Sequence, residues 1–163
     1  MRWKGTRMEK RKKVLDGISW GIVLLLMGMI FYFSSQVGEE SSELSGTVSF
    51  DLMKIFSNLF SKGWSFEQIN EHALQIEFFI RKVAHFSEYG ILGLAILVAL
   101  YRTTSLRGWK LWMMSVIIAC MYAASDEFHQ LFVPGRSGRV FDVCVDTCGS
   151  MAFTGIAKLW KKY

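Results

Sequence analysis

Apolar residues gather along this chain into four long runs instead of recurring at helical or strand period. The runs lie at about residues 17–35, 83–101, 111–132 and 140–157. Each run approaches or reaches the roughly 20 residues that a helix needs to cross the hydrocarbon core of a bilayer. The pattern predicts an all-α fold, an integral membrane bundle of four transmembrane helices.

A long polar segment, residues 37–80, joins the first two runs. Its acidic residues outnumber Lys54 and Lys62; they are Glu39, Glu40, Glu43, Asp51, Glu67, Glu71 and Glu77. Within it, apolar residues recur at helical spacing: Val48, Leu52, Ile55, Phe56, Leu59 and Phe60. Such a stripe predicts an amphipathic helix that lies on the membrane surface. Ser65 and Gln68 resemble a capping box that opens a helix leading into the second run.

Composition and charge support a membrane protein and orient it. Of the 163 residues, 52% are hydrophobic and one is proline, and the formal net charge is +5. The basic residues flank apolar runs instead of covering an exposed face, so nucleic-acid binding is not expected. Seven of the first thirteen residues are Lys or Arg. Further basic residues lie between the second and third runs and after the fourth: Arg102, Arg107, Lys110, Lys158, Lys161 and Lys162.

Positive residues favour the cytoplasmic side of a membrane. The distribution therefore predicts a multi-pass protein of the cell membrane, with a basic cytoplasmic N-terminus at residues 1–16 and a basic cytoplasmic tail at residues 158–163. The transmembrane domain comprises residues 17–157, and its segment 37–80 is extracytoplasmic.

Three polar clusters interrupt the apolar runs. The second run opens with Lys82, His85, Glu88 and Tyr89; the third ends with Asp126, Glu127, His129 and Gln130; the fourth begins with Asp142 and Asp146. In the predicted topology all three meet at the outer end of the bundle. Because ionisable groups within a span are costly unless paired or wetted, we expect these side chains to face one another around a cavity.

The short loop between the third and fourth runs departs from the positive-inside pattern. It reads VPGRSGR and contains Arg136, Ser137 and Arg139. A guanidinium can bind a phosphate or carboxylate through two hydrogen bonds, and glycines let backbone amides approach the same group. We therefore expect the loop to bind an anionic headgroup.

The same segments resemble a known family. FSSQ, HFSEYGILG, DEFHQLFVPGRSGR and FDVCVDTCG are similar, in order and spacing, to the motifs of the VanZ-like family. The resemblance covers about residues 30–156. It implies a four-span membrane protein, and it implies a link to glycopeptide resistance, because the founding member is associated with low-level resistance to teicoplanin.

The preferred interpretation is a cell-envelope protein that binds a membrane lipid or a lipid-linked cell-wall precursor and lowers sensitivity to lipoglycopeptide antibiotics. The predicted ligand-binding residues are Lys82, Tyr89, Glu127, Gln130, Arg136, Ser137, Arg139, Asp142 and Asp146. A membrane hydrolase or transferase acting on such a headgroup is an alternative, with His85, Glu88, Asp126 and His129 as catalytic residues.

Two further alternatives stay open. The polar clusters can act as a hydrogen-bond network that fixes helix register, or the protein can be a scaffold for partner proteins. Two histidines and several carboxylates also allow a mixed metal site, but no HExxH motif is present and the histidines come from different runs. No metal and no cofactor are therefore predicted.

Overall fold

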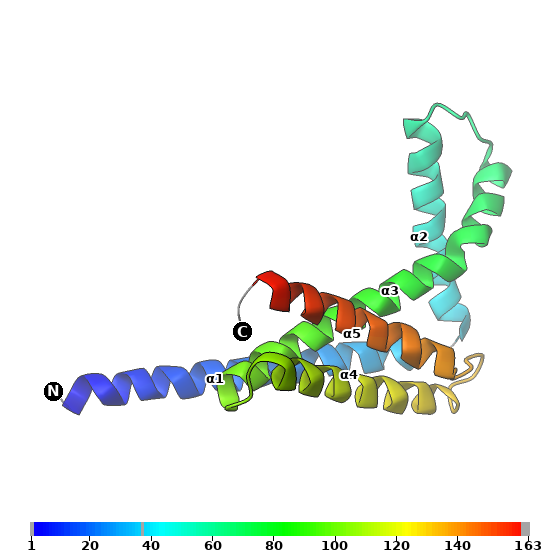
Figure 1. Ribbon diagram of the computed structural model, residues 1–163. Helices are drawn as coiled ribbons and strands as arrows, with labels where there is room; N and C mark the ends of the chain where they lie inside the picture. Colours follow the sequence, from blue (N-terminus) through cyan, green and yellow to red (C-terminus); the bar gives the residue numbers. More distant parts are fainter. Residues whose placement is uncertain (1, 37, 161–163) are drawn as a thin grey trace.

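A computed structural model describes residues 2–36 and 38–160 of the chain, and Figure 1 shows its helices. The helices are α1 (Arg2–Ser34), α2 (Gly38–Leu59), α3 (Phe66–Thr103), α4 (Gly108–Gln130) and α5 (Val140–Trp160). No strand occurs among these described residues. α1, α3, α4 and α5 are long and apolar enough to cross a membrane. The prediction of an all-α bundle with four candidate spans is confirmed.

The helices extend beyond the predicted spans at several ends. α1 begins at Arg2, within the basic segment, and α3 begins at Phe66, well before the second apolar run. The predicted capping box is present: the Gln68 backbone N–H donates to the Ser65 hydroxyl at 3.4 Å, and the Gln68 side chain accepts from the Ser65 N–H at 2.9 Å. The division at residues 16 and 158 stays a prediction, and residues 161–163 of the predicted tail lie outside the described residues.

α3 is the central helix, because it packs against each of the other four. The apolar core follows from this placement and is formed by Val23, Ile30, Tyr89, Leu92, Ile96, Leu97, Ala99, Leu100, Leu111, Ala119 and Ala123. α1 contacts mainly α3 and touches α4 only slightly. α1 is therefore the peripheral member of the bundle.

Small residues bring α3 and α5 close together. A Cβ added to Gly149 would collide with the backbone of Phe86, and one added to Gly93 would collide with Ser150. Gly90 faces the ring of Phe153 in the same tight way. Small residues that let backbones approach are typical of helix contacts in membranes. They bring residues 149–153 of α5 against residues 86–93 of α3.

α2 and the first half of α3 form a hairpin that crosses the direction of the bundle (Figure 1). The face of α2 against α3 contains buried Ser49 and Ser57, whereas Leu52, Ile55 and Leu59 are exposed. The predicted amphipathic segment is thus helical, and its apolar stripe is left for a partner other than α3. Its position on the membrane surface stays a prediction.

Candidate functional site

The polar residues gather at one end of the bundle, where α1 and α4 end and α5 begins; we call it the polar end. On the side of α3 that faces α5, Lys82 Nζ forms an ion pair with Asp142 Oδ1. One turn deeper, His85 Nδ1 lies 3.8 Å from Asp146 Oδ1, and the Asp146 side chain is fully buried. That separation is too long for a hydrogen bond. Within the described residues, neither Asp146 oxygen has a hydrogen-bond partner.

α4 supplies the other half of this group. Gln130 Nε2 donates to Asp126 Oδ2 and to Glu127 Oε1, both at 3.3 Å. Glu127 Oε2 accepts the backbone N–H of Arg139 at 2.8 Å. The loop can come this close because Gly138 has no Cβ to collide with the Glu127 carbonyl. We call the group between α3, α4 and α5 the acid cluster; it comprises Lys82, Tyr89, Asp126, Glu127, Gln130, Asp142 and Asp146.

Tyr89 lies between the acid cluster and the apolar core. Its side chain is fully buried, and its ring lies 6.1 Å from that of Tyr122. The Tyr122 hydroxyl donates to the Met27 carbonyl at 2.6 Å, which links α4 to α1. The acid cluster is therefore sealed on the side of the apolar core.

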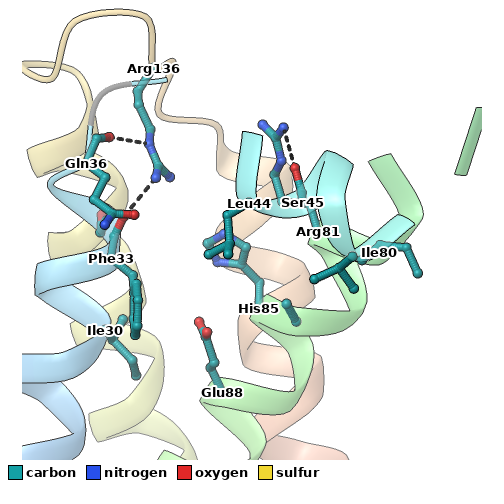
Figure 2. Close-up of a pocket in the computed structure, with 13 residues that line it drawn as sticks. Ile30, Phe33, Gln36, Leu44, Ser45, Ile80, Arg81, His85, Glu88 and Arg136 are labelled. Atoms are coloured by element: carbon teal, nitrogen blue, oxygen red, sulfur yellow. Dashed lines mark hydrogen bonds between the residues drawn. The ribbon is translucent and has the colours of Figure 1, made fainter. Parts of the chain in front are cut away.

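A cavity of about 230 Å³ lies on the other side of α3, between α1, α2 and α3 (Figure 2). Four ionisable side chains line it: Arg81, His85, Glu88 and Arg136. Apolar and small residues complete its wall, namely Ile30, Phe33, Ser34, Gln36, Leu44, Ser45, Val48, Ile80 and Ala84. The cavity occupies the fork where α1 and α2 diverge after Ser34. We call it the arginine pocket.

Both arginines of the pocket are held in place by the protein. Arg136 donates from Nε to the Gln36 carbonyl at 3.1 Å and from an Nη to the Phe33 carbonyl at 2.8 Å, so it caps the last carbonyls of α1. Arg81 donates from one Nη to Glu77 at 2.7 Å and to the Ser45 hydroxyl at 3.3 Å. These contacts occupy part of each guanidinium and fix its orientation.

The two arginines also repel each other. Burial lowers the pKa of Arg136, and the positive charge of Arg81 lowers it further, while Asp126, Glu127 and Glu88 act in the opposite direction. An arginine keeps its charge at any physiological pH. Two cations therefore line one pocket, Arg81 with Glu77 as its ion-pair partner and Arg136 with hydrogen bonds, within the described part of the chain, to backbone carbonyls only.

The structure divides the predicted site residues between two neighbouring groups. Lys82, Tyr89 and the carboxylates of α4 and α5 lie in the closed acid cluster, whereas Glu88 lines the open pocket on the other side of α3. His85 belongs to both, since it lines the pocket and its Nδ1 faces Asp146. On that side α5 approaches α3 so closely that a Cβ at Gly149 would collide with the Phe86 backbone.

Three predicted site residues lie outside both groups. The His129 ring stacks obliquely on Phe31 of α1, with 4.5 Å between ring centroids. Arg139 Nε donates to the Ser137 hydroxyl at 3.2 Å, and both side chains are exposed in the loop. Their predicted roles in binding or catalysis stay predictions.

Arg81 and Ser45 line the pocket, and sequence reasoning did not select them. A signal for Arg81 was present, because it follows Glu77 by four residues, the spacing of an ion pair on one helical face. Ser45 gave no such signal, since its role depends on how α2 packs against α3. Among the residues that the structure describes, no three His, Cys, Asp or Glu side chains are arranged to hold a metal ion.

Four helices of membrane length, with ionisable side chains gathered at one end, define a polytopic helical membrane protein with a polar site near one face of its bundle. More specifically, the chain belongs to the VanZ/LLP1 family, which it matches over residues 19–161. The resemblance seen in its motifs is thereby confirmed. Searches of curated proteins and of solved structures found no match.

Proposed function

We propose that this protein binds the anionic headgroup of a membrane lipid, or of a lipid-linked cell-wall precursor, in the arginine pocket. The observation that carries the proposal is that Arg81 of α3 and Arg136 of the α4–α5 loop line the same cavity. Guanidinium groups are well suited to phosphate and carboxylate, because their fork of N–H donors matches two oxygens.

The other lining residues fit a headgroup as well. His85 and Glu88 offer hydrogen-bonding partners for hydroxyl groups, and Phe33 and Leu44 provide apolar walls. The pocket lies at an end of the bundle, which is the depth at which lipid headgroups meet a membrane protein. Positive-inside counting supports an orientation with both termini in the cytoplasm and the pocket on the outer side.

A headgroup pocket on the outer side also suits the family association with glycopeptide resistance, because those antibiotics act outside the cell membrane. Reduced sensitivity to teicoplanin is part of the proposal. Comparing the inhibitory concentration of teicoplanin with and without expression of the protein tests it.

Binding can be tested with three arginine variants. Arg81→Gln and Arg136→Gln should each lower the amount of phosphatidylglycerol that the purified protein retains in nanodiscs, by about tenfold, because each removes a charge-assisted hydrogen-bond donor. Arg139→Gln is the matched control, since Arg139 lies in the same loop but does not line the pocket. Native mass spectrometry measures the retained lipid.

Equal retention by all four proteins would overturn the binding proposal. A loss confined to Arg139→Gln would move the site from the pocket to the exposed loop. Since Arg136 also caps α1, the unfolding midpoint of each variant is measured alongside. Arg81→Gln separates the two effects, because Arg81 makes no contact with the α1 carbonyls.

A second candidate function is a hydrolase or transferase that acts on the same headgroup. It is favoured by His85, which lines the pocket while its Nδ1 faces buried Asp146 at 3.8 Å. A carboxylate behind a histidine fixes its tautomer and lets the other ring nitrogen act as a general base, and such contacts are often long before substrate binds. Glu88 lines the same pocket and is a further candidate acid.

The enzyme candidate predicts that Asp146→Asn stops turnover of a labelled anionic lipid and leaves its binding in place, since Asp146 does not line the pocket. His85→Gln should stop turnover as well. Thin-layer chromatography of the lipid after incubation with the purified protein measures turnover. Product levels that do not differ between these variants and the wild type would remove this candidate.

A further inference from the structure

A second cavity, of about 170 Å³, lies between α1 and α3 beside the arginine pocket. Apart from Glu88 its lining is apolar: Leu26, Met29, Ile30, Phe33 and Ile91. Ile30, Phe33 and Glu88 line both cavities, so the two are neighbours with a common wall. We call the second cavity the apolar groove.

The groove runs inward from the polar end. Its α1 wall extends from Phe33, near the end of that helix, back to Leu26, which is a distance of about 10 Å along a helix axis. Its α3 wall continues from Glu88 to Ile91, deeper within the candidate span. The path leads from the arginines toward the middle of the bundle, as a lipid chain leads away from its headgroup.

The groove is open to the surroundings of the bundle. Met29 and Ile91 are each 48% exposed, although both belong to candidate membrane spans. α1 packs loosely, because it contacts α3 and touches α4 only slightly. A chain can therefore enter sideways from the bilayer without passing through the packed core.

The charges along this path favour one orientation of a ligand. Arg136 lies at the top of the pocket and Glu88 at the bottom, where the groove begins (Figure 2). An anionic group is attracted by the arginines at the top, whereas none of the described residues that line the groove is basic. From top to bottom, the path is lined first by arginines, then by Glu88, and then by apolar side chains. An amphiphile would therefore bind with its anionic head at the top and its chain in the groove.

From this geometry we infer that the apolar groove holds the first part of a hydrocarbon chain whose anionic headgroup occupies the arginine pocket. The inference rests on the proposed headgroup binding and adds to it a site for the lipid chain and a route of entry, sideways between α1 and α3. A water-soluble phosphate compound would leave the groove unused.

Filling the groove tests this inference. Met29→Trp and Ile91→Trp should each lower retention of palmitoyl-oleoyl phosphatidylglycerol by about tenfold and leave binding of soluble glycerol phosphate within about twofold of the wild type. Leu25→Trp is the matched control, because Leu25 lies on α1, is exposed, and does not line the groove. Native mass spectrometry follows the lipid, and isothermal titration calorimetry follows glycerol phosphate.

The outcomes separate the two proposals. A wild-type protein that retains neither probe contradicts headgroup binding itself. If the two groove variants retain as much phosphatidylglycerol as the wild type does, the headgroup proposal stands and the groove inference is overturned. Loss of both probes together in a folded variant also overturns the groove, because the change then acts on the pocket.

A second measurement needs no substitution. Wild-type protein should retain dioleoyl phosphatidylglycerol about tenfold better than the dihexanoyl lipid, because the short chains leave most of the groove unfilled. Equal retention of the two lipids overturns the inference even if the tryptophan variants fail to fold.

Discussion

The two sides of α3 use neighbouring residues to build opposite environments. Toward α4 and α5, Lys82 and Tyr89 join the acid cluster, whose side chains are mostly buried. Toward α1 and α2, Arg81 and Glu88 line an open pocket. The comparison teaches that the distance to the neighbouring helix decides the environment of a polar residue in a span. A close helix buries the residue in a packed contact, and a distant one leaves it facing an open pocket.

Glycine decides this spacing on one side and large apolar residues on the other. Gly149 lets α5 come so close to α3 that a Cβ there would collide with backbone. α1 presents Ile30 and Phe33 to the pocket instead, and α2 leaves in another direction (Figure 1). Closed packing suits a role in stability, whereas the open side is available to a ligand.

Replacing Gly149 with Leu should have the largest effect, because it forces α5 away from the Phe86 backbone. Overpacking of this kind costs about 3 kcal/mol or more when the neighbour is backbone. We expect the protein to accumulate poorly in membranes and to lose its cooperative unfolding transition in detergent, followed by circular dichroism.

Gly155→Leu is the matched control, since it lies on the same helix and nothing is within 4 Å of an added Cβ. It should accumulate as the wild type does. Comparable loss in both variants would show that α5 tolerates no leucine for a reason unrelated to its contact with α3.

Removing the charge of Lys82 should have an intermediate effect. Lys82→Met leaves the mostly buried Asp142 carboxylate without its ion-pair partner, which costs about 1 to 3 kcal/mol. Adding Asp142→Leu should recover part of the lost stability. Removing both partners of an ion pair costs less than leaving one buried charge without its partner. Thermal unfolding midpoints measure both, and a double variant less stable than Lys82→Met would contradict the expected coupling.

Two glutamates, one in the acid cluster and one in the arginine pocket, should show the smallest changes in stability and the most direct contrast. Glu127→Ala should lower stability by about 1 to 2 kcal/mol, because it leaves the Arg139 backbone N–H without its acceptor. Glu88→Ala should change stability by about 0.5 kcal/mol or less, since Glu88 faces the open pocket. Equal losses would mean that the pocket side is as tightly packed as the acid cluster.

Much of the fold could be predicted from the sequence, because hydrophobic length is a strong signal in membrane proteins. The four apolar runs and the capping box at Ser65 follow from residue spacing, and span order brings the cluster of Lys82 to the same end as that of Asp142. Span order brings clusters to the same end of a bundle. It does not say on which side of a shared helix each residue lies.

The pocket was harder to predict because its walls come from tertiary packing. An apolar stripe normally identifies the buried face of a helix, yet α2 buries Ser49 and Ser57 against α3 and exposes Leu52. The direction in which α2 leaves α1 therefore could not be inferred, and neither could the cavity in the fork between them. His129 shows the same limit, because its contact with Phe31 depends on the position of α1.

The length of α3 has a consequence for where the polar side chains meet the bilayer. Its 38 residues extend about 57 Å, nearly twice the roughly 30 Å of hydrocarbon that a span must cross. A crossing of about 20 residues that starts at Thr103 is complete near Ala84. A crossing with that start would place Arg81 and His85 on either side of the level at which acyl chains give way to phosphates and water, where exchange of a charged ligand has little desolvation cost.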